Sequence, residues 1–251
     1  MPVMDEFREE RAAIKQGTFK QKYQYFKDYY RTTVIIVILA LAFVGILLYH
    51  YVTRKDSACY AVMLNCAPYQ ENEWFEEEFA QAAGIDLDKY DVTFDTAIYY
   101  KLNSTDEDTL ITTEKLDVYT AAGELDVMLG AGDEFAHFAN SVLFKDLREV
   151  LNDEQIAKYE PYFYYVDSAA IGLVDYSVDN RQDLDKDQLV DPKHPEDMKE
   201  PIPVAIYVEG SDALNEAYYF KNADDGIALG IYANTSNTEN AISLIEYLMN
   251  H

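Results

Sequence analysis

The most prominent hydrophobic pattern is an apolar run near the start of the chain. Val34–Tyr49 carries no charged side chain, and Gly45 is its one non-apolar interruption. With its neighbours it makes a helix of 21 residues, Thr32–Val52, which is about 31 Å long and matches a bilayer core. The run is longer than the apolar part of a secretory signal, and no Ala-x-Ala-like cleavage site follows it. We therefore expect a retained transmembrane helix over 32–52, in contact with lipid through Val34–Tyr49.

Residues 1–31 have a different pattern, in which aromatic side chains recur at helical spacing and lysines lie between them. The aromatic residues are Phe19, Tyr23, Phe26 and Tyr30. Such a stripe suits the headgroup region of a membrane, which predicts an amphipathic leader over 1–31. Asp5–Lys15 predicts an earlier helix, separated by Gly17. A docking helix for a membrane protein partner is the alternative interpretation of this leader.

Charged residues flank the apolar run asymmetrically. Five basic side chains lie just before it, between Lys15 and Arg31, whereas Arg54 and Lys55 follow it and the next basic residue is Lys89. Because basic segments stay on the cytoplasmic side, the N-terminus should be cytoplasmic and the larger part of the chain extracellular. The expected localisation is thus a single-pass cell-membrane protein, with a short linker over 53–57 and a domain over 58–251.

Beyond the linker, short apolar runs alternate with amphipathic segments. Gly84 and Gly123 end two of the helices, and a Ser-Thr-Asp cap begins at Ser104. The expected elements are a strand Cys59–Leu64, a helix Glu71–Ala83, a strand Asp91–Tyr100, a helix 104–122, a strand Leu125–Leu129, a tight turn Gly130–Gly132 and a helix Asp133–Ser141. This alternation of strands and helices predicts an α/β fold with a parallel sheet.

The second half of the chain is less regular. The pattern predicts a helix Leu147–Tyr159, a strand or surface loop over Pro161–Val174, an exposed loop Val178–Glu200, a strand Ile202–Val208, a helix Ser211–Phe220, a strand Gly226–Tyr232 and a helix Asn237–Asn250. The loop contains Asp183–Asp187, which begins like a calcium-binding loop. Gln188 and His194 replace the glycine and glutamate that such a loop requires, so a solvated loop is favoured and cation binding stays open.

Charge and composition restrict the class of protein. The chain has a formal charge of −26, and residues 53–251 alone hold 13 basic and 41 acidic side chains, a charge of −28. Such a domain repels phosphate backbones, so we expect no nucleic-acid partner. Apolar residues make up 49%, which is enough for a packed core and argues against disorder.

The chemistry-bearing residues do not form a recognisable catalytic or metal motif. The sequence lacks Gly-x-Ser-x-Gly, His-Glu-x-x-His and a phosphate-binding glycine loop, so we expect no enzyme, no metal site and no cofactor. His137 lies between Phe135 and Phe138 and is expected to be a core or surface side chain. Cys59 and Cys66, read as parts of one strand, are too far apart to form a disulfide.

A ligand site is expected where strands of an open α/β sheet end, because ligands bind beyond their carboxyl ends. Glycines there would let a ligand approach the backbone, and tyrosines could stack on a sugar ring. The candidate binding residues are Asn65, Tyr69, Tyr99, Tyr100, Gly130, Gly132 and Asp133. The alternative is that the glycines only make a turn and the tyrosines only pack.

Three segments, in this order, resemble a known family. They are Ala121–Met128, Phe144–Leu147 and Ile231–Leu248. They are similar to a glycine-containing stretch before a strand, a connector between helices and a strand–turn–closing helix in the extracellular solute-binding proteins of ABC importers, of the two-lobed periplasmic-binding type. The leader, anchor and acidic ectodomain also resemble envelope proteins of Gram-positive anaerobes.

The resemblance implies a periplasmic-binding-like domain whose second lobe is reduced or missing, because family members are longer. It implies a non-catalytic, membrane-anchored module that captures a small molecule or peptide. The shortened second lobe keeps an alternative open, namely an envelope interaction or scaffold protein that uses the fold as a docking surface without a ligand.

Overall fold

The computed structural model describes residues 18–169, 189–208 and 210–250, which divide into two units. The first unit ends at Arg54, and the second begins at Lys55. The predicted helix 5–15 and the loop residues 178–188, with the acidic stretch Asp183–Asp187, lie outside the described residues.

The first unit is dominated by one helix, α2 (Phe19–Thr53), of 35 residues. Its Arg31–Thr53 portion is long and apolar enough to cross a membrane, and none of its most apolar window is buried in protein. The predicted apolar helix is therefore present. The aromatic stripe that begins at Phe19 is continuous with it rather than forming a separate helix.

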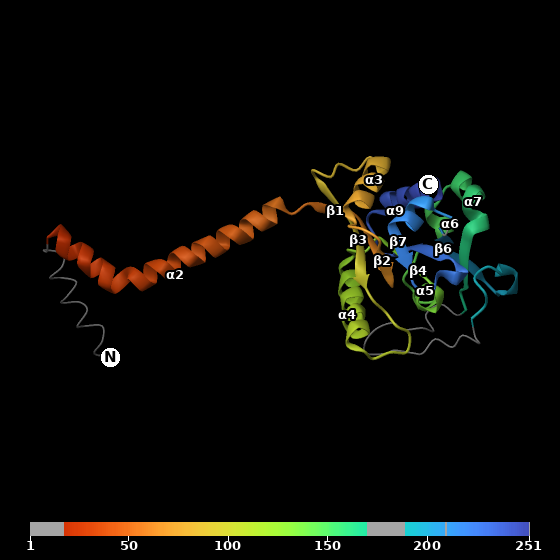
Figure 1. Cartoon of the computed structure of the whole chain (residues 1–251), viewed down its shortest axis with the longest axis horizontal. Coiled ribbons are helices and arrows are strands. Elements are labelled where there is room, and N and C mark those ends of the chain that lie inside the picture. The colour runs from red at the N-terminus through yellow and green to blue at the C-terminus, as the bar shows by residue number, and fades with distance from the viewer. Residues whose placement is uncertain (1–17, 170–188, 209, 251) are drawn as a thin grey trace. The chain divides into compact units, whose positions relative to one another are not determined.

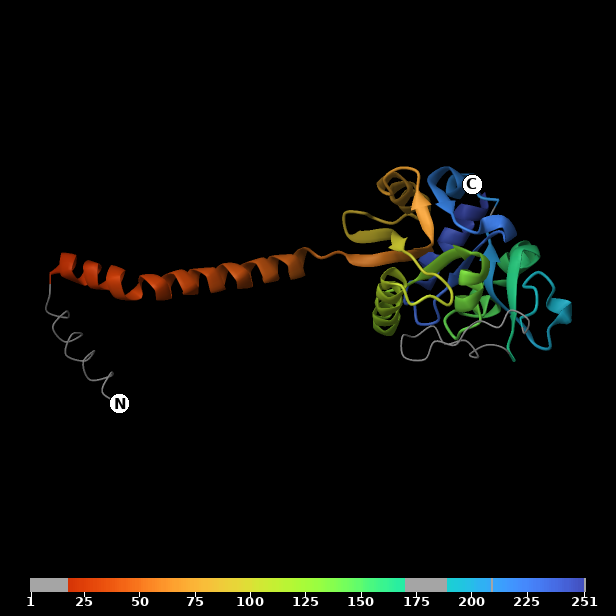
Figure 2. The same cartoon turned by 60° about the horizontal axis from the view of Figure 1, so that its bottom comes forward.

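The second unit is a mixed α/β structure (Figures 1 and 2). Its elements are β1 (Asp56–Leu64), β2 (Cys66–Pro68), α3 (Glu73–Ala83), β3 (Tyr90–Ile98), α4 (Glu107–Ala122), β4 (Val127–Ala131), α5 (Gly132–Ala139), α6 (Leu147–Val150), α7 (Asp153–Tyr159), β5 (Phe163–Asp167), β6 (Pro201–Tyr207), α8 (Asp212–Ala217), β7 (Tyr218–Phe220), β8 (Ile227–Ile231) and α9 (Thr238–Asn250). Short 3-10 turns lie at Glu160–Tyr162, Pro195–Asp197 and Ala223–Asp225.

Six strands form the central sheet in the order β3-β1-β4-β8-β6-β5. Strand β1 is parallel to both neighbours, whereas β8 is antiparallel to β4 and to β6, and β5 is antiparallel to β6. Because β6 thus points the same way as β1, β3 and β4, four strands share one direction. The predicted α/β class is present, and the sheet is mostly but not purely parallel.

The sheet is buried on both faces. Side chains of one face pack against α3 and α9, with Phe75, Phe79 and Leu244 among them. Side chains of the other face pack against α4 and α5, through Leu116 and Phe135. Figures 1 and 2 show helices on either side of the strands. Alternate residues of β1 serve the two cores, which explains why its sequence reads as one continuous apolar run.

Two predicted boundaries around β4 and β7 are wrong. Gly130 and Ala131 belong to β4, where they pair with Ala228 and Ile227 of β8, so the expected three-residue turn reduces to Gly132. The last three residues of the expected helix 211–220 form β7, which pairs with β2 in a separate two-stranded sheet. A distant strand partner therefore decides the conformation in both places.

The expected helix 147–159 is interrupted. Leu151 is extended, and Asn152 begins α7 with a capping box in which its side chain and that of Gln155 bond reciprocally to backbone. Of the tyrosine-rich segment 161–174, for which strand and loop were both open, Phe163–Asp167 forms strand β5, and residues 170–174 lie outside the described residues. Cys66 lies in β2 rather than in the strand of Cys59, and both cysteines are free and buried.

Candidate functional site

A cavity of about 390 Å³ lies at the carboxyl end of β4. Gly130 and Ala228, from the neighbouring strands β4 and β8, contribute to its wall. Side chains of α5, β5 and β6 contribute Phe135, Tyr164 and Tyr207. The cavity thus lies where α5 meets four strands, two running in each direction, on the face of the sheet that α5 covers.

Two glycines shape this end of β4. A Cβ atom at Gly130 would lie 3.1 Å from side-chain atoms of Leu64 and Phe135, so a larger residue would disturb the packing beneath the cavity. Gly132 has a φ of +62°, and a Cβ there would lie 3.1 Å from the Asn222 carbonyl oxygen. Both positions are therefore explained by local geometry, and both also expose backbone to the cavity.

The aromatic wall is a contiguous set of rings. The Tyr164 ring meets Phe135 edge-on, at 5.5 Å between centroids, and lies 5.4 Å from the Tyr207 ring. Burial raises the pKa of the Tyr164 hydroxyl, and the neighbouring Tyr207, Asp191 and Asp133 raise it further. The hydroxyl therefore stays protonated at neutral pH.

Acidic side chains outnumber basic ones among the described residues that line the cavity. Four aspartates, Asp133, Asp167, Asp191 and Asp225, accompany Lys193. The Lys193 ammonium donates to the Asp225 carbonyl oxygen at 3.0 Å and lies 4.6 Å from the centre of the Tyr207 ring. The described part of the wall therefore has a formal charge of −3, and the Lys193 ammonium already lies against it.

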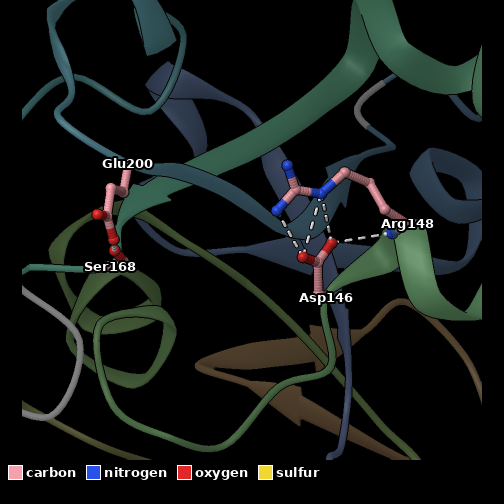
Figure 3. A network of polar contacts seen from close by, with 4 residues as sticks. All are labelled: Asp146, Arg148, Ser168 and Glu200. Carbon is pink, nitrogen blue, oxygen red and sulfur yellow. Dashed lines mark hydrogen bonds and ion pairs between the residues drawn. The ribbon is translucent and has the colours of Figure 1, made fainter.

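Asp167 connects the end of β5 to the segment before β6. It accepts hydrogen bonds from the backbone N–H groups of Lys199 and Glu200, and the Lys199 bond is the main cause of its lowered pKa. Next to it, the Ser168 hydroxyl donates to the Glu200 carboxylate at 2.6 Å (Figure 3). These bonds fix the position of the Asp167 carboxylate at the cavity.

Of the seven predicted binding residues, Gly130, Gly132 and Asp133 line the cavity, and the other four lie outside its lining. Asn65, at a φ of +51°, holds Tyr100 by accepting from its N–H and donating to its carbonyl oxygen. Tyr100 is buried, with its ring 5.5 Å from that of His137. Asn65 and Tyr100 thus have clear packing roles, and His137 is the core side chain that the sequence suggested.

Tyr69 and Tyr99 are exposed at the strand ends near the β2–β7 sheet. The Lys221 ammonium lies 5.9 Å from the Tyr99 ring, and the backbone N–H of Lys221 donates to the Asn65 carbonyl oxygen. The predicted residues therefore form two groups, one at the cavity and one around Asn65. A role in ligand binding for the second group stays a prediction.

The three segments that carry the family resemblance meet in the structure. Buried Asp126, from the first, accepts hydrogen bonds from the Tyr60 N–H and from the side chains of Thr235 and Asn237 in the third. In the second, Lys145 donates its N–H to the Ile231 carbonyl oxygen. These segments position β4, β8 and α9, and they do not themselves form the cavity.

Asp146 of the second segment also forms an ion pair with Arg148, which Figure 3 shows. Asp146 accepts hydrogen bonds from the Arg148 guanidinium at 2.6 and 2.9 Å, and from the Arg148 N–H at the first turn of α6. The bond to Asp146 raises the pKa of Arg148, and Asp146 at the same time is the N-cap of α6. The guanidinium is therefore already occupied by the capping carboxylate.

Sequence reasoning missed Tyr164, Tyr207, Asp191 and Lys193. The alternating burial of β5 is the signal for Tyr164, but the adjacent tyrosines obscure it in the sequence. No local sequence pattern predicts that residues 189–193 line the cavity, because this depends on how a segment without helix or strand lies against β5. One such contact is the bond from the Tyr165 N–H to the Pro192 carbonyl oxygen.

Within 18–169, 189–208 and 210–250, no cluster of His, Cys, Asp and Glu side chains has the geometry to hold a metal ion. Comparison of the chain with known protein families, with curated proteins and with solved structures gives no match.

Proposed function

We propose that this protein is a membrane-anchored, non-catalytic solute-binding module, which captures a small molecule or short peptide outside the cell. The observation that carries the proposal is the cavity at the carboxyl end of β4. Pockets of several hundred Å³ with apolar walls and a few polar groups are the usual form of small-molecule sites. The position of the cavity beyond the end of a strand also agrees with where α/β sheets bind ligands.

The membrane part of the proposal is supported by α2 and its flanking charges. Arg31–Thr53 has the length and apolar character of a membrane span, and more basic residues precede it than follow it. We propose a cytoplasmic N-terminus and an extracellular domain. The resemblance to periplasmic-binding proteins with a reduced second lobe belongs to this proposal, with one sheet providing the site.

The orientation is tested by adding protease to intact cells that produce the full chain with a C-terminal epitope tag. Digestion of the domain to a membrane-protected N-terminal fragment is expected. A cytoplasmic protein serves as the control for cell integrity. A domain that stays intact on intact cells and is digested after permeabilisation would contradict the proposed orientation.

Solute capture is tested on the full chain in lipid nanodiscs, with thermal unfolding followed by tyrosine and tryptophan fluorescence. The panel contains sugars, amino acids, short peptides, amines and carboxylates. A solute present at about 100 times its dissociation constant should raise the unfolding temperature by about 5 °C or more. A panel that produces no shift would contradict solute capture.

A matched pair of variants locates the binding. Ala136→Phe places a ring in the cavity that Ala136 lines, and should remove the shift. Ala121→Phe makes the same change at an exposed position of α4 and should retain it. Ala136→Val, a smaller change, separates a filled cavity from a disturbed fold. Equal shifts in all three variants would place the binding elsewhere and overturn the cavity as the site.

A second candidate function is supported by the outer face of α4. Ile111 and Val118, seven residues apart and thus on one face, are 55% and 63% exposed. The buried face of the same helix carries Thr109, Thr112, Thr113 and Leu116. Apolar residues on the outer face and threonines on the inner face suit a docking surface for a membrane protein partner.

The docking function predicts that Ile111→Glu with Val118→Lys, which leaves the net charge unchanged, detaches a partner that co-purifies with the full chain from membranes. Cross-linking before solubilisation measures the association. A control double variant at exposed polar positions, Glu114→Gln with Lys101→Gln, should leave it intact. Unchanged association after the α4 substitutions would contradict docking through this face.

A further inference from the structure

Lys193 shows what kind of group the cavity accommodates. Its ammonium lies 4.6 Å from the centre of the Tyr207 ring and donates to the Asp225 carbonyl oxygen. A cation over an aromatic face is stabilised by the negative charge of the ring's π-system, and a carbonyl oxygen accepts one of its protons. The wall of the cavity therefore already holds one ammonium in a geometry typical of ammonium recognition.

The rest of the lining repeats the same chemistry. Tyr164 provides a second ring beside Tyr207, and Asp133 and Asp191 add carboxylates at the cavity. Among the described residues of the lining, the four aspartates accompany a single lysine, Lys193. Carboxylates with aromatic faces form the usual binding surface for organic cations.

An anionic solute does not fit this surface. The first turn of α5, where free N–H groups would attract an anion, carries Asp133 and Glu134. The charge of −28 on residues 53–251 also repels anions at long range and concentrates cations. Both the local and the overall electrostatics therefore favour a positively charged ligand.

We infer that the solute captured in this cavity carries a primary ammonium group, which binds over Tyr207 in the place that the Lys193 ammonium occupies. This inference rests on the proposed function, and it adds the class of solute, an organic amine. The Lys193 ammonium is a built-in occupant of this position, and a ligand amine must displace it. Lys193 therefore lowers the affinity for amines, while its contacts with Tyr207 and Asp225 hold the cavity wall together.

The inference is tested with four solutes of similar length, namely 1,5-diaminopentane, 5-amino-1-pentanol, 1,5-pentanediol and glutarate. Titration calorimetry on the full chain in nanodiscs measures each dissociation constant. The two amines should bind at least about tenfold more tightly than the diol or glutarate. Their affinity should also fall as salt is raised from 50 to 500 mM, because the attraction is partly screened.

Charge-neutralising variants test the carboxylates. Asp191→Asn and Asp133→Asn should each weaken amine binding by about tenfold, because each removes one charge from the wall. Asp88→Asn removes the same charge at an exposed position outside the lining and should have little effect. Amine binding that resists Asp191→Asn, Asp133→Asn and Ala136→Phe would lie elsewhere and overturn the inference.

Lys193→Met tests the built-in occupant, because methionine keeps much of the apolar stem and removes the ammonium. Amine affinity should rise about tenfold, whereas Lys101→Met, at an exposed position outside the lining, should leave it unchanged. Weaker amine binding in Lys193→Met would overturn the displacement. Suppose that the diol or glutarate binds, that Ala136→Phe abolishes this binding, and that the two amines do not bind. The amine inference then fails, and solute capture stands. If no solute of this series or of the broader panel binds, both fail.

Discussion

At the scale of single residues, Asp126 connects parts of the chain that are far apart in sequence. Its buried carboxylate accepts from the Tyr60 N–H, from Thr235 and from Asn237, and its own N–H donates to the Tyr60 carbonyl oxygen. A buried charge is tolerated when several donors surround it. The strand β1, the strand β4 and the turn before α9 are thus fixed by one side chain.

Removing this carboxylate should destabilise the domain. Asp126→Ala leaves buried donors of Tyr60 and Thr235 without an acceptor, and we expect a loss of about 3 kcal/mol in the free energy of unfolding. Urea unfolding followed by fluorescence measures it as a lower midpoint with an unchanged slope. Asp88→Ala, at an exposed position, is the control. A midpoint within experimental error of the wild type would show that Asp126 contributes little.

Gly230 gives a second residue-scale prediction. A Cβ atom there would lie 2.7 Å from the Phe144 ring, so the ring would have to move. We expect Gly230→Ala to destabilise by about 2 kcal/mol through overpacking, measured by the same urea unfolding. Gly210→Ala makes the same change where no atom lies within 4 Å, and should be neutral or slightly stabilising. Equal effects of the two substitutions would contradict the close contact with Phe144.

The candidate site illustrates what residue types reveal in a sequence. Gly130, Gly132 and Asp133 could be placed at the cavity from the sequence, because they follow a short buried strand and the carboxyl ends of such strands are where ligands bind. Their role in ligand binding stays a prediction. Tyr99 and Tyr100 are adjacent tyrosines that the sequence does not distinguish, but the Tyr99 side chain is exposed and that of Tyr100 is only 3% exposed. Lys193 lines the cavity through a tertiary contact with Tyr207, and no local sequence pattern predicts such a contact.

At the scale of elements, caps and glycine ends were the best guides. Gly84 and Gly123 terminate α3 and α4 in left-handed conformation, as the sequence suggested, and Asp106 is the cap of α4 within the predicted Ser-Thr-Asp group. Predicted element boundaries were wrong where pairing with a distant strand decides the conformation, as in β7, which pairs with β2. Three-residue strands lack a detectable period, so the β2–β7 sheet could not be predicted from sequence.

Asp106 gives a prediction about pH. Its carboxylate accepts from Thr109 and Ser104, which lowers its pKa from 3.8 to about 2. Since the folded-state pKa is below the unfolded one, its contribution to stability is complete above about pH 4 and disappears as pH falls toward 2. The gap in unfolding temperature between wild type and Asp106→Ala should therefore narrow as pH is lowered from about 4 to about 2.

The control for this pH effect is Asp106→Asn, because asparagine is also a good helix cap but does not titrate. Its stability relative to Asp106→Ala should stay constant over the same range. A gap between wild type and Asp106→Ala that is independent of pH would show that the Asp106 charge does not contribute to capping.

At the scale of the whole molecule, the chain divides between an apolar helix and an acidic domain with its own cores. The division at Arg54 and Lys55 lies within the region where the sequence predicted a linker. Alternating strands and helices predicted a parallel sheet, and β3, β1 and β4 are parallel to one another, although their order was not predicted. The antiparallel insertion of β8 was not predictable, because strand direction depends on the path of the chain and not on hydrophobic pattern.

Because the two units have separate internal contacts, a variant lacking residues 1–54 should be soluble without detergent and keep the domain fold. Its unfolding temperature should lie within about 2 °C of that of the full chain, measured by fluorescence. Circular dichroism checks that the α/β content is retained. Aggregation of this variant, or a much lower unfolding temperature, would show that the domain needs α2 for stability.

The place of β8 has a consequence for biogenesis. This strand comes from residues 227–231, yet it lies between β4 and β6 and is hydrogen-bonded to both. In a nascent chain that ends at residue 226, the edges of β4 and β6 that β8 would cover stay unpaired. No strand then joins the β5–β6 pair to β3-β1-β4 by hydrogen bonds. Unpaired edges promote aggregation and attract quality-control factors. Incomplete translation products of this protein would thus be recognisable to the cell, because the six-stranded sheet is completed only when β8 has been synthesised.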